Sequence, residues 1–303
     1  MTTGSPSSES ARDSATGSGD VLRVALAQIA PVLGDQRQNL RLHLERIGEA
    51  RRRGAELVVF PELSLTGYFV RDMVPDLAME PSSPEIRELL EAAGRMSLVA
   101  GFVEESPQHR FYNSAFYAEG GRIVHLHHKV YLPTYGLFDE RRYFAAGERI
   151  RAFDTARFGR MGILICEDFW HLSTAAVMQA EEVDVLLCVA NSPARGVDGP
   201  EIRTVETYRQ LAATFAMLIG TVVIVVNRVG FEDGLCFWGG SMVVGPDGHT
   251  IAEAPLLDEA LTMATFDLAE LRRERVISPL LRDERLLLTI EELNRIRRQR
   301  YES

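Results

Sequence analysis

The sequence almost lacks lysine. Of its 33 basic residues, 32 are arginine and only one, Lys129, is lysine. Two interpretations are open from composition alone. One lysine has survived by chance on a solvated surface, or this position needs a compact ammonium on a flexible stem that the guanidinium fork of arginine cannot replace. The residues around Lys129 must decide between them.

Other scarcities exclude whole classes of protein. There are three cysteines without paired spacing, which favours free thiols in a reducing compartment and predicts a cytoplasmic protein. No apolar run reaches the roughly 18 residues that cross a bilayer, so no membrane association is expected. Positive charge is in deficit, with a net charge of −10, which argues against nucleic acid as a partner.

The remaining composition predicts a soluble globular protein with a short N-terminal tail. Residues 1–20 are rich in Ser, Gly and Thr, and we expect a disordered tail there. Residues 21–303 contain no linker and predict one domain, in which residues 284–303 form a C-terminal helical extension. Apolar strand runs alternate with helical patterns. Two packed sheets with helices outside, or one doubly wound sheet, both fit this pattern.

Three polar residues stand directly at the ends of apolar strand runs. Glu62 follows residues 55–60, Lys129 follows residues 122–128, and Cys166 ends a run that begins at residue 160. Each has a plain structural interpretation, as a solvated acid, a surface cation or a buried thiol. Together they supply the base, the oxyanion partner and the nucleophile that covalent acyl transfer requires.

Two histidines lie beside the lysine. His125, His127 and Lys129 share one face if residues 122–128 form a strand, so the histidines suggest a metal pair. No third ligand is evident nearby, and we expect no metal.

The segments around the three polar residues resemble the nitrilase, or carbon–nitrogen hydrolase, superfamily. The matching stretches are FPELSLTGY around Glu62, HHKVYLPTYGLFDERRYFAAGE around Lys129 and GILICEDFW around Cys166, separated by 67 and 37 residues. Three ordered motifs at such spacing are far more specific than one. The resemblance covers residues 21–290. It implies an α/β fold, a four-layer αββα sandwich, no cofactor, and a homodimer or higher homo-oligomer.

The resemblance also assigns individual residues. It implies a catalytic triad of Glu62, Lys129 and Cys166, with Glu140 as a second glutamate that holds the lysine. LPTYGLFDE and CEDFW look most like the glutaminase part of glutamine-dependent NAD synthetases. In that branch the substrate amide is contacted by residues that here correspond to Tyr135, Phe138, Glu167 and Ser192. Arg195 is either a further contact or a surface residue.

The expected function is therefore hydrolysis of a non-peptide C–N bond in a small carboxamide, through a cysteine thioester and with release of ammonia. The alternatives are a nitrilase, an N-carbamoyl amidohydrolase, or a stand-alone glutaminase that supplies ammonia to a separate synthetase. A non-catalytic scaffold is the alternative outside enzymes. The SGG-x-DS loop of pyrophosphatase type does not occur in the sequence, so NAD synthesis is not expected of this chain.

Overall fold

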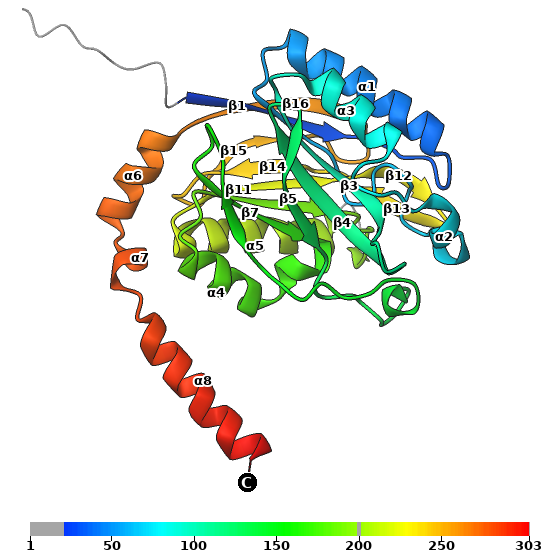
Figure 1. Ribbon diagram of the computed structural model, residues 1–303. Helices are drawn as coiled ribbons and strands as arrows, with labels where there is room; N and C mark the ends of the chain where they lie inside the picture. Colours follow the sequence, from blue (N-terminus) through cyan, green and yellow to red (C-terminus); the bar gives the residue numbers. More distant parts are fainter. Residues whose placement is uncertain (1–20, 199–200, 303) are drawn as a thin grey trace, which may run out of the picture.

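The computed structural model describes residues 21–198 and 201–302, and the tail expected for residues 1–20 lies outside them. Twelve strands of the described chain form two six-stranded mixed sheets that face each other (Figure 1). The first sheet has the order β16 (Ala260–Asp267), β1 (Val21–Gln28), β2 (Leu57–Val59), β3 (Ser97–Glu105), β4 (Phe111–Glu119) and β5 (Arg122–His128). The second has the order β15 (Thr250–Glu253), β14 (Met242–Val244), β11 (Val222–Asn227), β8 (Val185–Ala190), β7 (Arg160–Ile165) and β6 (Ala152–Asp154).

Two short strand pairs stand apart from these sheets. They are β9 (Val197–Asp198) with β10 (Glu201–Ile202), and β12 (Val229–Glu232) with β13 (Leu235–Trp238). In each large sheet the central strands run parallel, β1 with β2 and β3, and β7 with β8 and β11. The carboxyl ends of parallel strands meet at one edge of a sheet, so polar residues that follow them lie close together.

Helices cover the outer faces of both sheets. Helices α1 (Gln36–Arg52) and α3 (Pro84–Ala93) bury Ile47 and Leu89 against the first sheet. Helices α4 (Leu172–Ala180) and α5 (Arg203–Ile219) bury Met178 and Phe215 against the second. A short α2 (Val74–Leu77) lies near the end of β3. This arrangement confirms the predicted αββα sandwich, and the alternative of a single doubly wound sheet is wrong.

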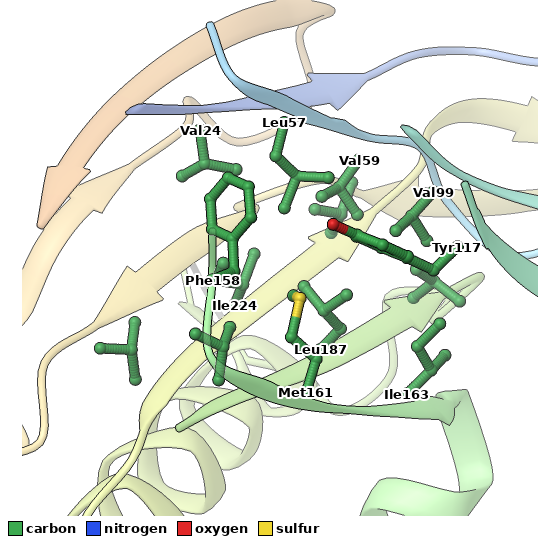
Figure 2. Packing of buried hydrophobic residues seen from close by; sticks show 14 of the residues in the cluster. Val24, Leu57, Val59, Val99, Tyr117, Phe158, Met161, Ile163, Leu187 and Ile224 are labelled. Atoms are coloured by element: carbon green, nitrogen blue, oxygen red, sulfur yellow. The ribbon is translucent and has the colours of Figure 1, made fainter. Parts of the chain in front are cut away.

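The inner faces of the two sheets form an apolar core. Figure 2 shows Leu57, Val59 and Val99 of the first sheet facing Leu187 and Ile224 of the second. All five side chains are fully buried. Each buried aliphatic side chain of this size contributes about 2 kcal/mol by leaving water, so the core fixes the spacing of the two sheets.

The last three helices lead away from the sandwich (Figure 1). They are α6 (Leu268–Ile277), α7 (Leu280–Asp283) and α8 (Leu286–Tyr301), and α8 has no buried residue. Residues 284–303 were predicted as a helical extension, and α8 occupies most of that range. In the described residues we find no helix that is both long and apolar enough to cross a membrane.

Candidate active site

The three polar strand-end residues come together from different sheets. Glu62 follows β2 and Lys129 follows β5 of the first sheet, whereas Cys166 follows β7 of the second. Lys129 Nζ donates to Glu62 Oε1 over 2.7 Å, and both side chains are 0% exposed. The interpretations of Glu62 as a solvated acid and of Lys129 as a surface cation are therefore wrong.

Lys129 carries a buried ammonium between two carboxylates. Besides Glu62, its Nζ donates to Glu140 Oε1, also over 2.7 Å. Burial lowers the pKa of Lys129, but the charges of Glu140 and Glu62 outweigh that effect and raise it well above its usual value. Among the residues that the structure describes, these two oxygens are the only acceptors of Nζ, so one of its three N–H groups is left for a substrate oxygen.

The Glu62 carboxylate is held by two asparagines that the sequence analysis did not single out. Asn113 Nδ2 donates to Oε1 over 2.7 Å, and the Asn191 backbone N–H donates to Oε2 over 2.8 Å. The Asn191 side chain also donates to the Glu62 carbonyl oxygen. Asn191 follows the apolar strand β8 directly, so the strand-end pattern that marked Glu62 also marks this residue.

The backbone around Glu62 needs a glycine on the neighbouring strand. A Cβ atom at Gly101 of β3 would lie 2.4 Å from the Leu63 nitrogen and 2.7 Å from the Pro61 carbonyl oxygen. Leu63 itself has a φ of 43°, a left-handed conformation that non-glycine residues adopt at a cost. The loop after β2 is therefore pressed against β3, which fixes the place of the Glu62 side chain.

Glu140 joins the lysine on its other side. The predicted second glutamate lies in a short 3-10 helix, η2 (Glu140–Arg142), and its Oε1 accepts from both Lys129 and the Tyr68 hydroxyl, the latter over 2.5 Å. Burial and the nearby Glu62 charge raise the pKa of Glu140 to about 7, although Lys129 opposes this rise. A cavity of about 220 Å³ opens beside Glu140 and Tyr68.

Cys166 begins a sharp turn at the end of β7. Its φ is 47°, again in the left-handed region, and it opens a short 3-10 helix, η3 (Cys166–Trp170). Strained strand-to-helix turns of this kind present a nucleophile to a cleft. Burial, followed by the Glu62 charge, raises the pKa of the Cys166 thiol above its usual value, against the effect of Lys129. The resting nucleophile is therefore a thiol, and its proton needs an acceptor before attack.

Asp168 ties the cysteine turn to the lysine strand, and the sequence analysis missed it. Its Oδ1 accepts the N–H groups of the two residues after Lys129, over 3.0 and 2.8 Å. Its Oδ2 accepts the N–H of the residue before Cys166 over 3.1 Å, and Nε2 of His127 over 2.9 Å. The carboxylate is fully buried. One side chain thus fixes the relative position of the two sheets at the site.

Replacing Asp168 with asparagine will reduce turnover more than substrate binding. Four donors now share the two carboxylate oxygens of Asp168, whereas asparagine has only one acceptor oxygen. We therefore expect the free energy of unfolding to fall by about 3 kcal/mol. Misplacement of Cys166 relative to Lys129 should lower kcat by about 100-fold with a small change in KM. The control is Asp184→Asn, which removes a carboxylate that accepts from Arg160 at the opposite end of β7. Equal loss of kcat in both variants would contradict a positioning role.

Of the residues expected to contact substrate, Tyr135, Phe138 and Glu167 lie together beside the cysteine turn, whereas Ser192 makes no hydrogen bond with them among the described residues. The Tyr135 hydroxyl donates to the Glu167 carboxylate over 2.9 Å, and the Phe138 ring lies 5.8 Å from that of Tyr135. The Arg195 guanidinium lies over the Phe138 ring at 5.1 Å. Ser192 is buried, and its backbone N–H donates to Asn227.

The two histidines beside Lys129 have different partners. His127 binds Asp168, and His125 stacks on Phe153.

Known proteins share this architecture and sequence pattern. The chain is 31% identical to a glutamine-dependent NAD(+) synthetase of Acinetobacter baylyi, over 84% of this chain and 46% of that protein. It is 32% identical to the enzyme of that name from Thermotoga maritima, over 85% of this chain and 44% of that protein. The chain thus spans about half the length of the curated relatives it matches.

A solved structure matches over nearly its whole length. The carbon–nitrogen hydrolase of Helicobacter pylori G27 is 25% identical, with a TM-score of 0.81 over 90% of this chain and 98% of that one. The family model of the carbon–nitrogen hydrolases matches residues 23–275, which include every predicted site residue. These matches confirm the family resemblance and the two-sheet fold. The chain belongs to the carbon–nitrogen hydrolase family.

Proposed function

We propose that the protein hydrolyses a small carboxamide through a thioester on Cys166 and releases ammonia. The observation that carries this proposal is the buried Lys129 ammonium, bound to Glu62 and Glu140 at 2.7 Å each, beside a cysteine in a left-handed turn. A fixed ammonium in a site without bulk water is suited to an oxyanion, and a buried carboxylate is suited to proton transfer.

In the first half of the reaction, Glu62 accepts the proton of the Cys166 thiol as sulfur attacks the amide carbonyl carbon. The C=O electron pair moves to oxygen, where the Lys129 ammonium and the backbone N–H of Glu167 stabilise the negative charge. One such donor is typically worth about 3 kcal/mol in the transition state. The oxyanion then re-forms the carbonyl, the C–N bond breaks, and Glu62 returns the proton to the departing ammonia.

In the second half, Glu62 accepts a proton from water as the water oxygen attacks the thioester carbonyl. The same two donors stabilise the second oxyanion. When the C–S bond breaks, the sulfur takes the proton from Glu62, which restores the thiol and the free carboxylate. The products are a carboxylic acid and ammonia, and no redox step or added cofactor is required by this balance.

The rim of the site supports an amino-acid amide such as glutamine as substrate. Glu167, only 16% exposed, supplies a carboxylate for an α-amino group, and Arg195 supplies a guanidinium for an α-carboxylate. Phe138 lies between the two charges, next to Tyr135. Relatives named as glutamine-dependent enzymes support the same choice. A simple aliphatic amide carries no group of opposite charge for either Glu167 or Arg195.

A panel of compounds tests this proposal by ammonia release. We expect glutamine to be hydrolysed with a higher kcat/KM than butyramide, a nitrile or an N-carbamoyl amino acid. Replacing Glu167 with glutamine should raise KM for glutamine by about 10-fold or more, because it removes one charged contact, and should leave butyramide nearly unaffected. The matched control is Asp139→Asn, which removes an exposed carboxylate from the segment that carries Tyr135 and Phe138. Preference for a nitrile or carbamoyl compound would overturn the assignment of a carboxamide.

A further inference from the structure

A second cavity, of about 450 Å³, lies beside the edge strand β5, and none of the proposed catalytic side chains lines it. Its walls come from the start of β4, from β5 and from the loop before β6. Three arginines, Arg110, Arg149 and Arg151, contribute to the lining, together with histidines of β5. The only carboxylate in the lining is that of Glu148. In a chain with a net charge of −10, such a cluster of positive charge is unusual.

The guanidiniums of this cavity have no carboxylate partners. In residues 21–198 and 201–302, no carboxylate oxygen lies within ion-pair distance of Arg110, Arg149 or Arg151, whereas arginines such as Arg157 and Arg160 are paired. A comparable cavity of about 490 Å³ elsewhere on the sandwich has two carboxylates in its lining, Glu56 and Glu119, and its Arg157 pairs with Glu56, although its other arginines form no ion pair within the described residues. Unpaired arginines that line one cavity repel each other unless a bound anion neutralises their charges.

The walls of the cavity are held in place before any ligand arrives. The His128 ring stacks on Tyr112 with the centroids 4.1 Å apart, and its Nε2 is 2.9 Å from the Glu104 carboxylate. The loop before β6 is fastened by the Gly147 N–H, which donates to the Lys129 carbonyl oxygen over 2.8 Å. A Cβ atom at Gly147 would lie 2.2 Å from the His128 carbonyl oxygen, so this close approach requires glycine.

His125 of β5 is one of the residues that line this cavity. Burial, then the neighbouring His127 and Arg151, lower the pKa of His125 to about 4, so its imidazole is neutral at physiological pH. Its buried Nε2 has no hydrogen-bond partner among the described residues. The ring is fixed by stacking on Phe153, with the centroids 4.3 Å apart. The cavity is therefore lined by three arginine cations and by an imidazole that carries no charge.

We propose that this cavity binds a small anion that carries a phosphoryl group, through Arg110, Arg149 and Arg151. Guanidinium forks match phosphate oxygens in bidentate geometry, and the volume lies in the range of small-ligand sites. The cavity also adjoins the active site through one residue. His127 lines it and binds the Asp168 carboxylate that positions Lys129 and Cys166.

Calorimetric titration of the full chain with inorganic pyrophosphate at low salt tests the proposal. We expect saturable 1:1 binding with a Kd below about 1 mM, which the double variant Arg149→Gln/Arg151→Gln weakens at least about 10-fold, equivalent to about 1.4 kcal/mol for the pair of arginines. Both arginines are exposed, so the variant should fold, and thermal unfolding verifies that. Ribose 5-phosphate in a parallel titration distinguishes a sugar phosphate from the free anion, and binding of either supports the proposal.

The control variant is Arg95→Gln/Arg122→Gln, which removes the same charge from the other cavity. It should change pyrophosphate affinity less than about 2-fold after correction for screening. Equal weakening by both double variants would show delocalised attraction and overturn the proposal, as would the absence of saturable heat up to about 10 mM ligand. Protein alkylated at Cys166 should still bind pyrophosphate. The outcome is therefore independent of whether the amidase assignment holds.

Discussion

Replacing Lys129 with arginine will lower kcat by about 1000-fold, although the positive charge is kept. One nitrogen atom of Lys129 lies 2.7 Å from an oxygen of Glu62 and 2.7 Å from an oxygen of Glu140. The planar guanidinium cannot place one atom between both oxygens and still direct an N–H at a substrate carbonyl. Loss of a single oxyanion donor typically costs 10²–10³ in rate, and displacement of the carboxylates adds to it. Steady-state kinetics with the best amide of the panel give the comparison.

The free energies of unfolding of two Lys129 variants separate the effect of side-chain shape from the effect of charge. Arginine adds volume to a fully buried position, and we expect a loss of about 2 kcal/mol. Lys129→Met removes the charge instead and leaves Glu62 facing Glu140 without a cation, which should cost about 4 kcal/mol. Chemical denaturation measures both. If Lys129→Arg retained more than about a tenth of wild-type turnover, an ordinary cation would suffice here and the near absence of lysine would be chance.

Replacing Cys166 with alanine will abolish turnover, with a fall of at least about 10⁴-fold, because no other nucleophile can form the acyl intermediate. The matched control is Cys188→Ala, since Cys188 is fully buried in β8 and its thiol pKa is raised well above its usual value, chiefly by burial. The control should keep wild-type activity within a small factor.

Mass spectrometry of the intact protein tests the same residue by a second route. Rapid quenching during turnover should give a mass increase equal to the acyl group, and peptide analysis should place it on Cys166. The Cys166→Ala variant should show none. Ammonia release that persists in this variant, or an acyl group on another residue, would remove the thioester from the mechanism.

The sequence predicts the parts of the site that carry a local pattern. Glu62, Lys129 and Cys166 each follow an apolar strand, and this pattern together with three motifs leads to residues that the structure brings to one site. The choice between two packed sheets and one doubly wound sheet needed the family resemblance, because strands that are buried on both faces look alike in either fold.

No sequence pattern shows which residues contact the triad. Asn191 is 129 residues from Glu62 in the chain, and Tyr68 is 72 residues from Glu140, yet each pair is hydrogen bonded. The packing of one sheet on the other brings Asn191 to Glu62, and the segments that follow β2 and β5 of one sheet bring Tyr68 to Glu140. Asp168 is the instructive case, since it is two residues from Cys166 but its role depends on contacts with the strand of Lys129. A residue's own neighbours in sequence do not reveal a contact of that kind.

The two sheets divide the chemistry between them, because Lys129 belongs to the first and Cys166 to the second. The apolar core that separates them therefore acts as a spacer as well as a source of stability. Sliding one sheet by about 1 Å would leave most of that burial intact but would move the nucleophile away from the ammonium. Natural selection on such a core therefore depends on whether a substitution preserves the alignment of the two sheets. Volume-conserving changes that shift a strand would be removed even where the protein stays folded.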